Sequence, residues 1–82
     1  MNGGRRMETW LYETESGYNG TVKADDADRA AKLAWAELCG RNPDFYRGGV
    51  VYIWMANAPQ PRLEFEIEVE SIPAFHAKRT GL

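Results

Sequence analysis

Hydrophobic and polar residues alternate strictly along the stretch from Leu63 to Glu70. Successive side chains of a β-strand point to opposite faces, so the alternation would separate the two kinds of residue. One face would carry four apolar residues: Leu63, Phe65, Ile67 and Val69. The other would carry four glutamates: Glu64, Glu66, Glu68 and Glu70. This pattern does not fit the helical period, and it predicts a strand that is buried on one face.

Three further segments have the composition of strands. Residues 7–13 alternate less cleanly but are rich in aromatic residues, and residues 21–24 follow the turn sequence of residues 16–20. This turn contains Asn-Gly, a strong hairpin signal, so the two segments should form a β-hairpin. Residues 50–56 are apolar on both faces, which is typical of a central strand or of one whose outer face is also covered.

The segment between the second and third strands predicts one helix over about residues 26–39. Asp25 or Asp26 would cap its N-terminus, and Gly40 is a favourable residue just after a helix end. A helical wheel places Ala27, Ala31, Ala34 and Leu38 together, with Ala30 and Trp35 beside them. This alanine stripe would let the helix lie close to a sheet. In the loop at 41–49, Phe45 and Tyr46 are expected to pack back onto the body.

The predicted fold is therefore an α+β domain with the element order ββαββ. A four-stranded antiparallel sheet in the order 2-1-3-4, with the helix on one face, keeps all neighbours antiparallel. A second arrangement, in which the hairpins lie around the opposite edge of the sheet, stays open. We expect residues 1–6 to be a flexible lead-in, residues 7–72 the single domain and residues 73–82 a C-terminal tail. The acidic strand would then lie at an edge of the sheet.

One helix can cover only one face of such a sheet. The residues expected beneath it are Met7, Leu11, Val22, Val51, Ile53, Met55, Leu63, Phe65, Ile67 and Val69. The opposite face would expose rings and carboxylates together: Trp10, Tyr12, Val50, Tyr52, Trp54, Glu64, Glu66, Glu68 and Glu70. An exposed aromatic patch usually marks an interaction surface. The structural alternative is that the glutamates protect a sheet edge and the aromatic residues stabilise the sheet by cross-strand pairing.

The charge distribution favours a positively charged partner. The 82-residue chain has a net charge of −2, with ten basic and twelve acidic residues. Four of the basic residues, Arg5, Arg6, Lys78 and Arg79, lie outside residues 7–77, which contain every acidic residue and so carry about −6. A nucleic-acid-binding core would normally have a basic patch. We therefore expect a protein partner with a basic surface rather than direct nucleic-acid binding.

No residue pattern indicates catalysis. Cys39 is the only cysteine and His76 the only histidine, so neither an internal disulfide nor a Cys/His metal site is expected. Carboxylates along one flat strand do not converge on a point, as a metal ion or a reacting bond requires. The chain also has no apolar run of membrane-spanning length. We expect a cytoplasmic protein that is not an enzyme and uses no cofactor or metal.

The stretch from Gly20 to Trp35 runs from a short strand through an acidic cap into an alanine-rich helix. The chain resembles small proteins of bacteriophages and mobile elements, particularly the anti-CRISPR proteins. The resemblance rests on this strand-to-helix connection, on the short length of the chain and on its acidic body. The resemblance implies a phage-encoded inhibitor in a bacterial host cell, which would bind an RNA-guided nuclease or surveillance complex and block its binding to DNA.

In such a complex, the aromatic residues Trp10, Tyr12, Tyr52 and Trp54 would anchor the contact. The four glutamates would pair with basic residues of the partner. Two alternatives stay open. The first is a homo-oligomeric structural module of a phage or mobile element, with the aromatic face packed against its own copy. The second is a nucleic-acid accessory protein that uses the basic ends of the chain.

Overall fold

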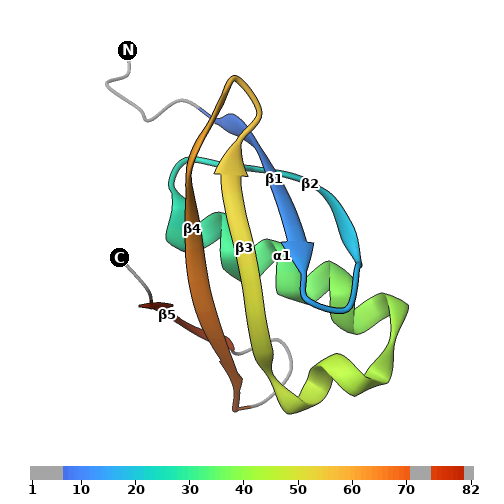
Figure 1. Cartoon of the computed structure of the whole chain (residues 1–82). Helices are drawn as coiled ribbons and strands as arrows, with labels where there is room; N and C mark the ends of the chain where they lie inside the picture. Colours follow the sequence, from blue (N-terminus) through green and yellow to red (C-terminus); the bar gives the residue numbers. More distant parts are fainter. Residues whose placement is uncertain (1–6, 71–74, 81–82) are drawn as a thin grey trace.

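Five strands and one α-helix build the fold, which we describe from a computed structural model of residues 7–70 and 75–80 (Figure 1). The elements in chain order are β1 (Glu8–Thr14), β2 (Asn19–Ala24), α1 (Ala27–Arg41), the 3₁₀-helix η1 (Pro43–Arg47), β3 (Gly49–Met55), β4 (Ala58–Val69) and β5 (Phe75–Thr80). Residues 1–6, predicted as a lead-in, fall outside the described residues. Within those residues, no helix is both long and apolar enough to cross a membrane.

The strands form one antiparallel sheet in the order β2-β1-β3-β4-β5. The α+β class and the predicted order of the first four strands are confirmed, and α1 lies across one face of the sheet (Figure 1). The prediction of four strands is wrong, because part of the segment expected to be a tail forms β5 and pairs with β4. The acidic strand β4 is therefore an inner strand, and β5 forms that edge of the sheet.

Both ends of α1 are set by side-chain and backbone caps. Asp26 is the N-cap, as one of the two predicted alternatives, and its carboxylate accepts a hydrogen bond of 2.8 Å from the backbone N–H of Arg29. The predicted end at Gly40 is wrong, since the helix continues to Arg41 and the N–H of Asn42 donates to the Leu38 carbonyl at 3.0 Å. Pro43 accounts for this end, because a residue that precedes proline disfavours the helical conformation.

The core lies between α1 and the sheet. The helix buries its predicted stripe of small residues, and the sheet supplies most of the large side chains. The buried apolar residues are Trp10, Tyr12, Val22, Ala24, Ala30, Ala31, Ala34, Trp35, Leu38, Cys39, Val51, Ile53, Phe65 and Ile67. The inner residues of β3 and β4 lie under the helix as predicted. Met7 does not, because its side chain is 61% exposed.

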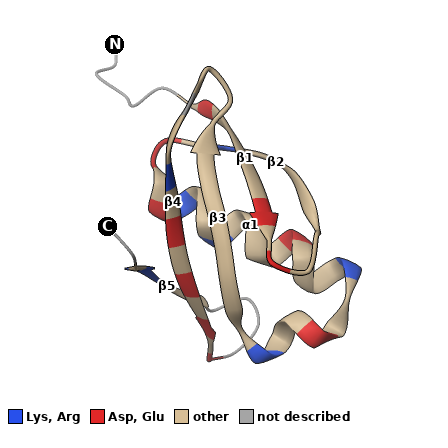
Figure 2. Ribbon diagram, viewed as in Figure 1, with Lys and Arg blue, Asp and Glu red and all other residues tan. Residues whose placement is uncertain are grey.

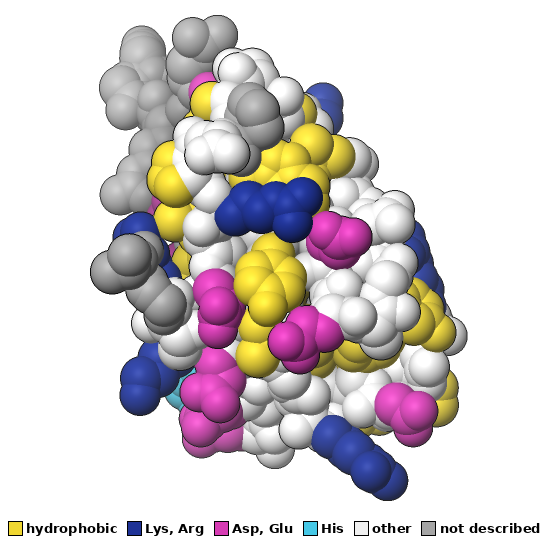
Figure 3. Space-filling view, in the orientation of Figure 1, with side chains coloured by type: hydrophobic (Ala, Val, Ile, Leu, Met, Phe, Trp, Pro, Cys, Tyr) yellow, Lys and Arg dark blue, Asp and Glu magenta, His cyan; other side chains and the backbone are white. Residues whose placement is uncertain are grey.

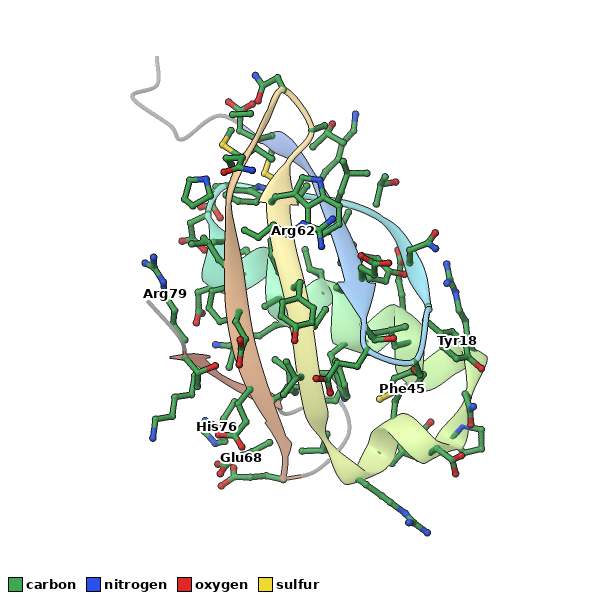
Figure 4. All side chains as sticks on the ribbon, in the orientation of Figure 1. Tyr18, Phe45, Arg62, Glu68, His76 and Arg79 are labelled. Carbon is green, nitrogen blue, oxygen red and sulfur yellow. The ribbon has the colours of Figure 1, made fainter. Side chains whose placement is uncertain are left out.

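The connection after α1 closes one end of the core. The ring of Phe45 packs edge-on against Trp35 and Tyr18, each with ring centroids 5.0 Å apart, and the indole N–H of Trp35 donates to the Phe45 carbonyl at 2.8 Å. Tyr18 and Phe45 lie beside each other at this end of the molecule (Figure 4). The prediction that this loop packs back is confirmed for Phe45. It is wrong for Tyr46, which is exposed.

Candidate functional site

The face of the sheet that points away from α1, called the open face below, has bulky rings at its centre. Strand β3 lies in the middle of the sheet, and its alternate residues Val51 and Ile53 are fully buried on the helix side. The period of two therefore turns Val50, Tyr52 and Trp54 to the open face, where they are half-buried. The pairing of β1 with β3 brings Leu11 beside Trp54 and Glu13 beside Tyr52.

Carboxylates lie on both sides of these rings. On one side, β4 carries Glu64 opposite Tyr52 and Glu66 opposite Val50, and Glu68 follows on the same face. On the other side, Glu13 of β1 and Glu15 of the following turn approach Tyr52, whose hydroxyl donates to Glu15 at 3.4 Å. The acidic row follows β4 while β3 carries no charge (Figure 2). Hydrophobic side chains lie between the acidic groups in the space-filling view (Figure 3).

Two of the four predicted aromatic anchors are not on the open face. The structure places Trp10 and Tyr12 under α1 with 8% and 0% of their surface exposed, so the prediction that these two rings point outward is wrong. The indole N–H of Trp10 donates to the Ala24 carbonyl at 3.1 Å, and the Tyr12 hydroxyl donates to Glu37 of α1 at 2.9 Å. The alanine-rich side of the helix leaves space that these large rings fill. Leu11, predicted beneath the helix, is instead on the open face.

Strand β5 changes the surroundings of the glutamate row. Lys78 lies opposite Glu66 and His76 opposite Glu68, and the hydroxyl of Thr80 donates to Glu64 at 2.9 Å. Glu70 follows the last residue of β4 and its carboxylate lies 2.9 Å from Nε2 of His76. The row is thus flanked by a basic strand on its outer side, and Glu68 and His76 lie close together in Figure 4. The carboxylates of Glu13, Glu15 and Glu64 lie nearest to Tyr52, and they are the ones that face the rings.

Sequence reasoning overlooked Arg62, which occupies the centre of the open face. Its guanidinium carbon lies 4.1 Å from the centroid of the Trp54 ring, and its Nη1 lies 3.3 Å from Oε1 of Glu13. The register Ile53–Leu63 places Arg62 beside Trp54 across the strand pair. A signal was present in the sequence, because Arg62 has the same even spacing as the four glutamates and so shares their face.

Two shallow hollows adjoin Arg62 and Trp54. The larger, of about 490 Å³, is lined by Glu13, Thr14, Glu15, Tyr52, Arg62, Glu64 and Thr80. The other, of about 320 Å³, is lined by Leu11, Tyr12, Glu13, Asn19, Gly20, Thr21 and Trp54. Glu13 borders both. The open face therefore combines a polar, largely acidic hollow with a more apolar one.

Within residues 7–70 and 75–80, three groups have shifted pKa values. Desolvation raises the pKa of Tyr52, and the charges of Glu15 and Glu64 raise it further. Burial, followed by the hydrogen bond to Glu37, raises the pKa of Tyr12 to about 12. Burial also raises the pKa of the Cys39 thiol, which keeps it protonated and weakly nucleophilic at neutral pH. None of these groups is shifted towards a reactive charged form.

The open face can therefore supply apolar contact, aromatic stacking and negative charge. Among residues 7–70 and 75–80, no cluster of three or more His, Cys, Asp or Glu is placed to hold a metal ion. Comparison of the chain with protein-family models, with curated proteins and with solved structures finds no match.

Proposed function

We propose that this chain is a non-catalytic binding protein whose open face docks onto a basic surface of another protein. The observation that carries the proposal is the position of Tyr52 and Trp54, half-buried at the centre of the face and set between carboxylates of β1 and β4. Tyr and Trp supply much of the binding energy in protein interfaces. Carboxylates around them would steer a basic partner and discriminate against acidic ones.

The partner that we propose is a subunit of an RNA-guided nuclease or surveillance complex. Support comes from the resemblance of residues 20–35 to anti-CRISPR proteins and from the chemistry of the face. Such complexes hold nucleic acid in positively charged channels. An acidic face bound in such a channel would compete with target DNA. In this proposal the chain is a phage-encoded inhibitor that blocks DNA binding.

A competition experiment tests this proposal. Purified RNA-guided complexes, loaded with guide RNA, are mixed with labelled target DNA and increasing amounts of the chain, and DNA binding is followed by mobility shift. We expect the wild-type chain to displace DNA from at least one complex. The variant Glu66→Gln/Glu68→Gln should be a weaker inhibitor. Glutamine is preferred to lysine because Lys78 and His76 lie directly opposite on β5, where added positive charge would weaken the sheet.

Asp28→Asn/Asp44→Asn is the matched control. It likewise removes two negative charges, from exposed positions on α1 and η1 that line neither of the hollows beside Trp54. We expect it to inhibit as well as the wild-type chain. If no complex loses its DNA, or if the two double variants inhibit equally, the proposed docking surface is wrong.

A further inference from the structure

Arg62 is a cation on a face where the neighbouring charged groups are carboxylates. Its guanidinium group covers the Trp54 ring and pairs with Glu13, and these two contacts form what we call the Arg62 seat. The side chain of Arg62 is 54% exposed and that of Glu13 40% exposed. Solvent and salt weaken such contacts, so Arg62 can leave its seat without disturbing the core.

The groups around the seat carry more negative than positive charge. The larger hollow is lined by three carboxylates, those of Glu13, Glu15 and Glu64, and by Arg62 as its single cation. Glu15 and Glu64 accept hydrogen bonds from the uncharged hydroxyl groups of Tyr52 and Thr80, respectively. Arg62 therefore neutralises only part of the charge, and a second cation would be attracted to the same place.

We propose that the Arg62 seat is the docking position for an arginine side chain of the partner, and that Arg62 keeps it closed in the unbound protein. This inference rests on the proposed docking function of the open face. The arginine of the partner would stack on Trp54 and pair with Glu13, while Arg62 swings away into solvent. Arg62 thus acts as an internal competitor that lowers affinity for basic partners and raises selectivity.

Arginine fits the seat better than lysine does. A planar guanidinium group stacks on an aromatic ring and forms paired hydrogen bonds with a carboxylate, whereas an ammonium group is compact and strongly hydrated. Arg62 itself demonstrates the fit, with its guanidinium carbon 4.1 Å from the Trp54 centroid. An arginine-rich peptide should therefore use the seat more fully than a lysine-rich peptide of equal length.

Fluorescence anisotropy with labelled oligo-arginine and oligo-lysine peptides tests the inference. Arg62→Gln should bind oligo-arginine more tightly than the control Arg47→Gln, by about two- to five-fold, the range that loss of an exposed cation–π contact implies. Arg47 lies in η1 and lines neither hollow, so its variant corrects for the loss of one positive charge. The gain should be smaller with oligo-lysine.

A double variant identifies Trp54 as the group that Arg62 covers. In a Trp54→Leu background, Arg62→Gln should no longer strengthen binding of oligo-arginine, because the ring that it uncovers is missing. If Arg62→Gln binds no more tightly than Arg47→Gln while the wild-type chain binds the peptide, the competitor role of Arg62 is wrong and the docking face stands. Failure of every variant to bind oligo-arginine would overturn both proposals.

Discussion

The two faces of the sheet use the same kinds of side chain for different purposes. On the helix side, Trp10 and Tyr12 of β1 are buried, and their polar atoms form hydrogen bonds within the chain. On the open face, Trp54 and Tyr52 of the neighbouring strand are half-buried, and their polar contacts, to Arg62 and Glu15 respectively, are with exposed side chains. Residue type alone therefore does not distinguish a core position from a position on the open face.

The difference follows from what covers each face. The rings under α1 fill a space that a helix lined by Ala30, Ala31 and Ala34 leaves open, and this burial stabilises the fold. In the part of the chain that the structure describes, no helix lies over the rings of β3, since α1 covers the other face of the sheet (Figure 1). They are only half-buried, so they remove less apolar surface from water than the rings under α1 do and contribute less to stability. Substitutions on the helix side should hence affect stability, and those on the open face should affect binding.

The largest expected effect is the loss of Trp10. Trp10→Ala removes a buried ring and its hydrogen bond to Ala24, and should lower the free energy of unfolding by about 3–5 kcal/mol. Trp54→Ala should lower it by about 1 kcal/mol or less, since the ring is only half-buried. Urea unfolding followed by circular dichroism measures both. Equal losses for the two variants would contradict the division between the faces.

A smaller loss of stability is expected from a substitution at Gly20 of β2, which lies against the Tyr12 ring. A Cβ atom at Gly20 would lie 2.6 Å from the Tyr12 hydroxyl oxygen, and that ring is fully buried and cannot yield. Gly20→Ala should therefore lower the free energy of unfolding by about 1–3 kcal/mol. Gly40→Ala is the control, because open space surrounds its Cβ position in α1, and it should raise stability by about 0.5–1 kcal/mol. A neutral Gly20→Ala would mean that Tyr12 is not fixed there.

The smallest stability effect concerns the Tyr12 hydroxyl and depends on pH. Its pKa is raised from the model-compound value of 10.0 to about 12 in the folded chain, so the unfolded chain loses this proton first as the pH rises. The stabilisation is fully present below pH 10 and is lost as the pH rises towards 12.

Urea unfolding of wild-type chain and Tyr12→Phe should therefore converge at high pH, with the variant less stable by about 1 kcal/mol near neutral pH. The open-face variant Tyr52→Phe is the control and should follow the wild-type curve more closely. A Tyr12→Phe curve parallel to that of the wild-type chain up to the highest pH would show that Tyr12 titrates alike in both states.

Much of the architecture could be predicted from the sequence. The alternation from Leu63 to Val69 identified β4 and its two faces, and the aspartates and alanines identified α1 and the side that it buries. These features follow from local periodicity, which depends little on the rest of the chain. Tyr52, Trp54 and the glutamates of β4 accordingly lie on the open face, as predicted.

The orientation of β1 could not be assigned from alternation, because both of its faces contain apolar residues. Bulk was the signal that could have decided it, since burying Trp10 and Tyr12 removes far more apolar surface from water than burying Leu11. Strand β5 was missed because its alternation is short and follows Pro73. The charges of β4 were a better signal for this strand, because His76 and Lys78 can pair with its glutamates and lie opposite them in the sheet.

Where a basic ligand binds is the most direct test of the account. In a ¹⁵N NMR titration with oligo-arginine peptide, we expect the Trp54 indole N–H and the amides of β3 and β4 to shift and saturate. The indole N–H groups of Trp10 and Trp35 are internal controls that should stay in place, because they donate to the Ala24 and Phe45 carbonyls. Shifts centred on α1 or η1, or no saturable shift at all, would contradict the assignment of the open face as the docking surface.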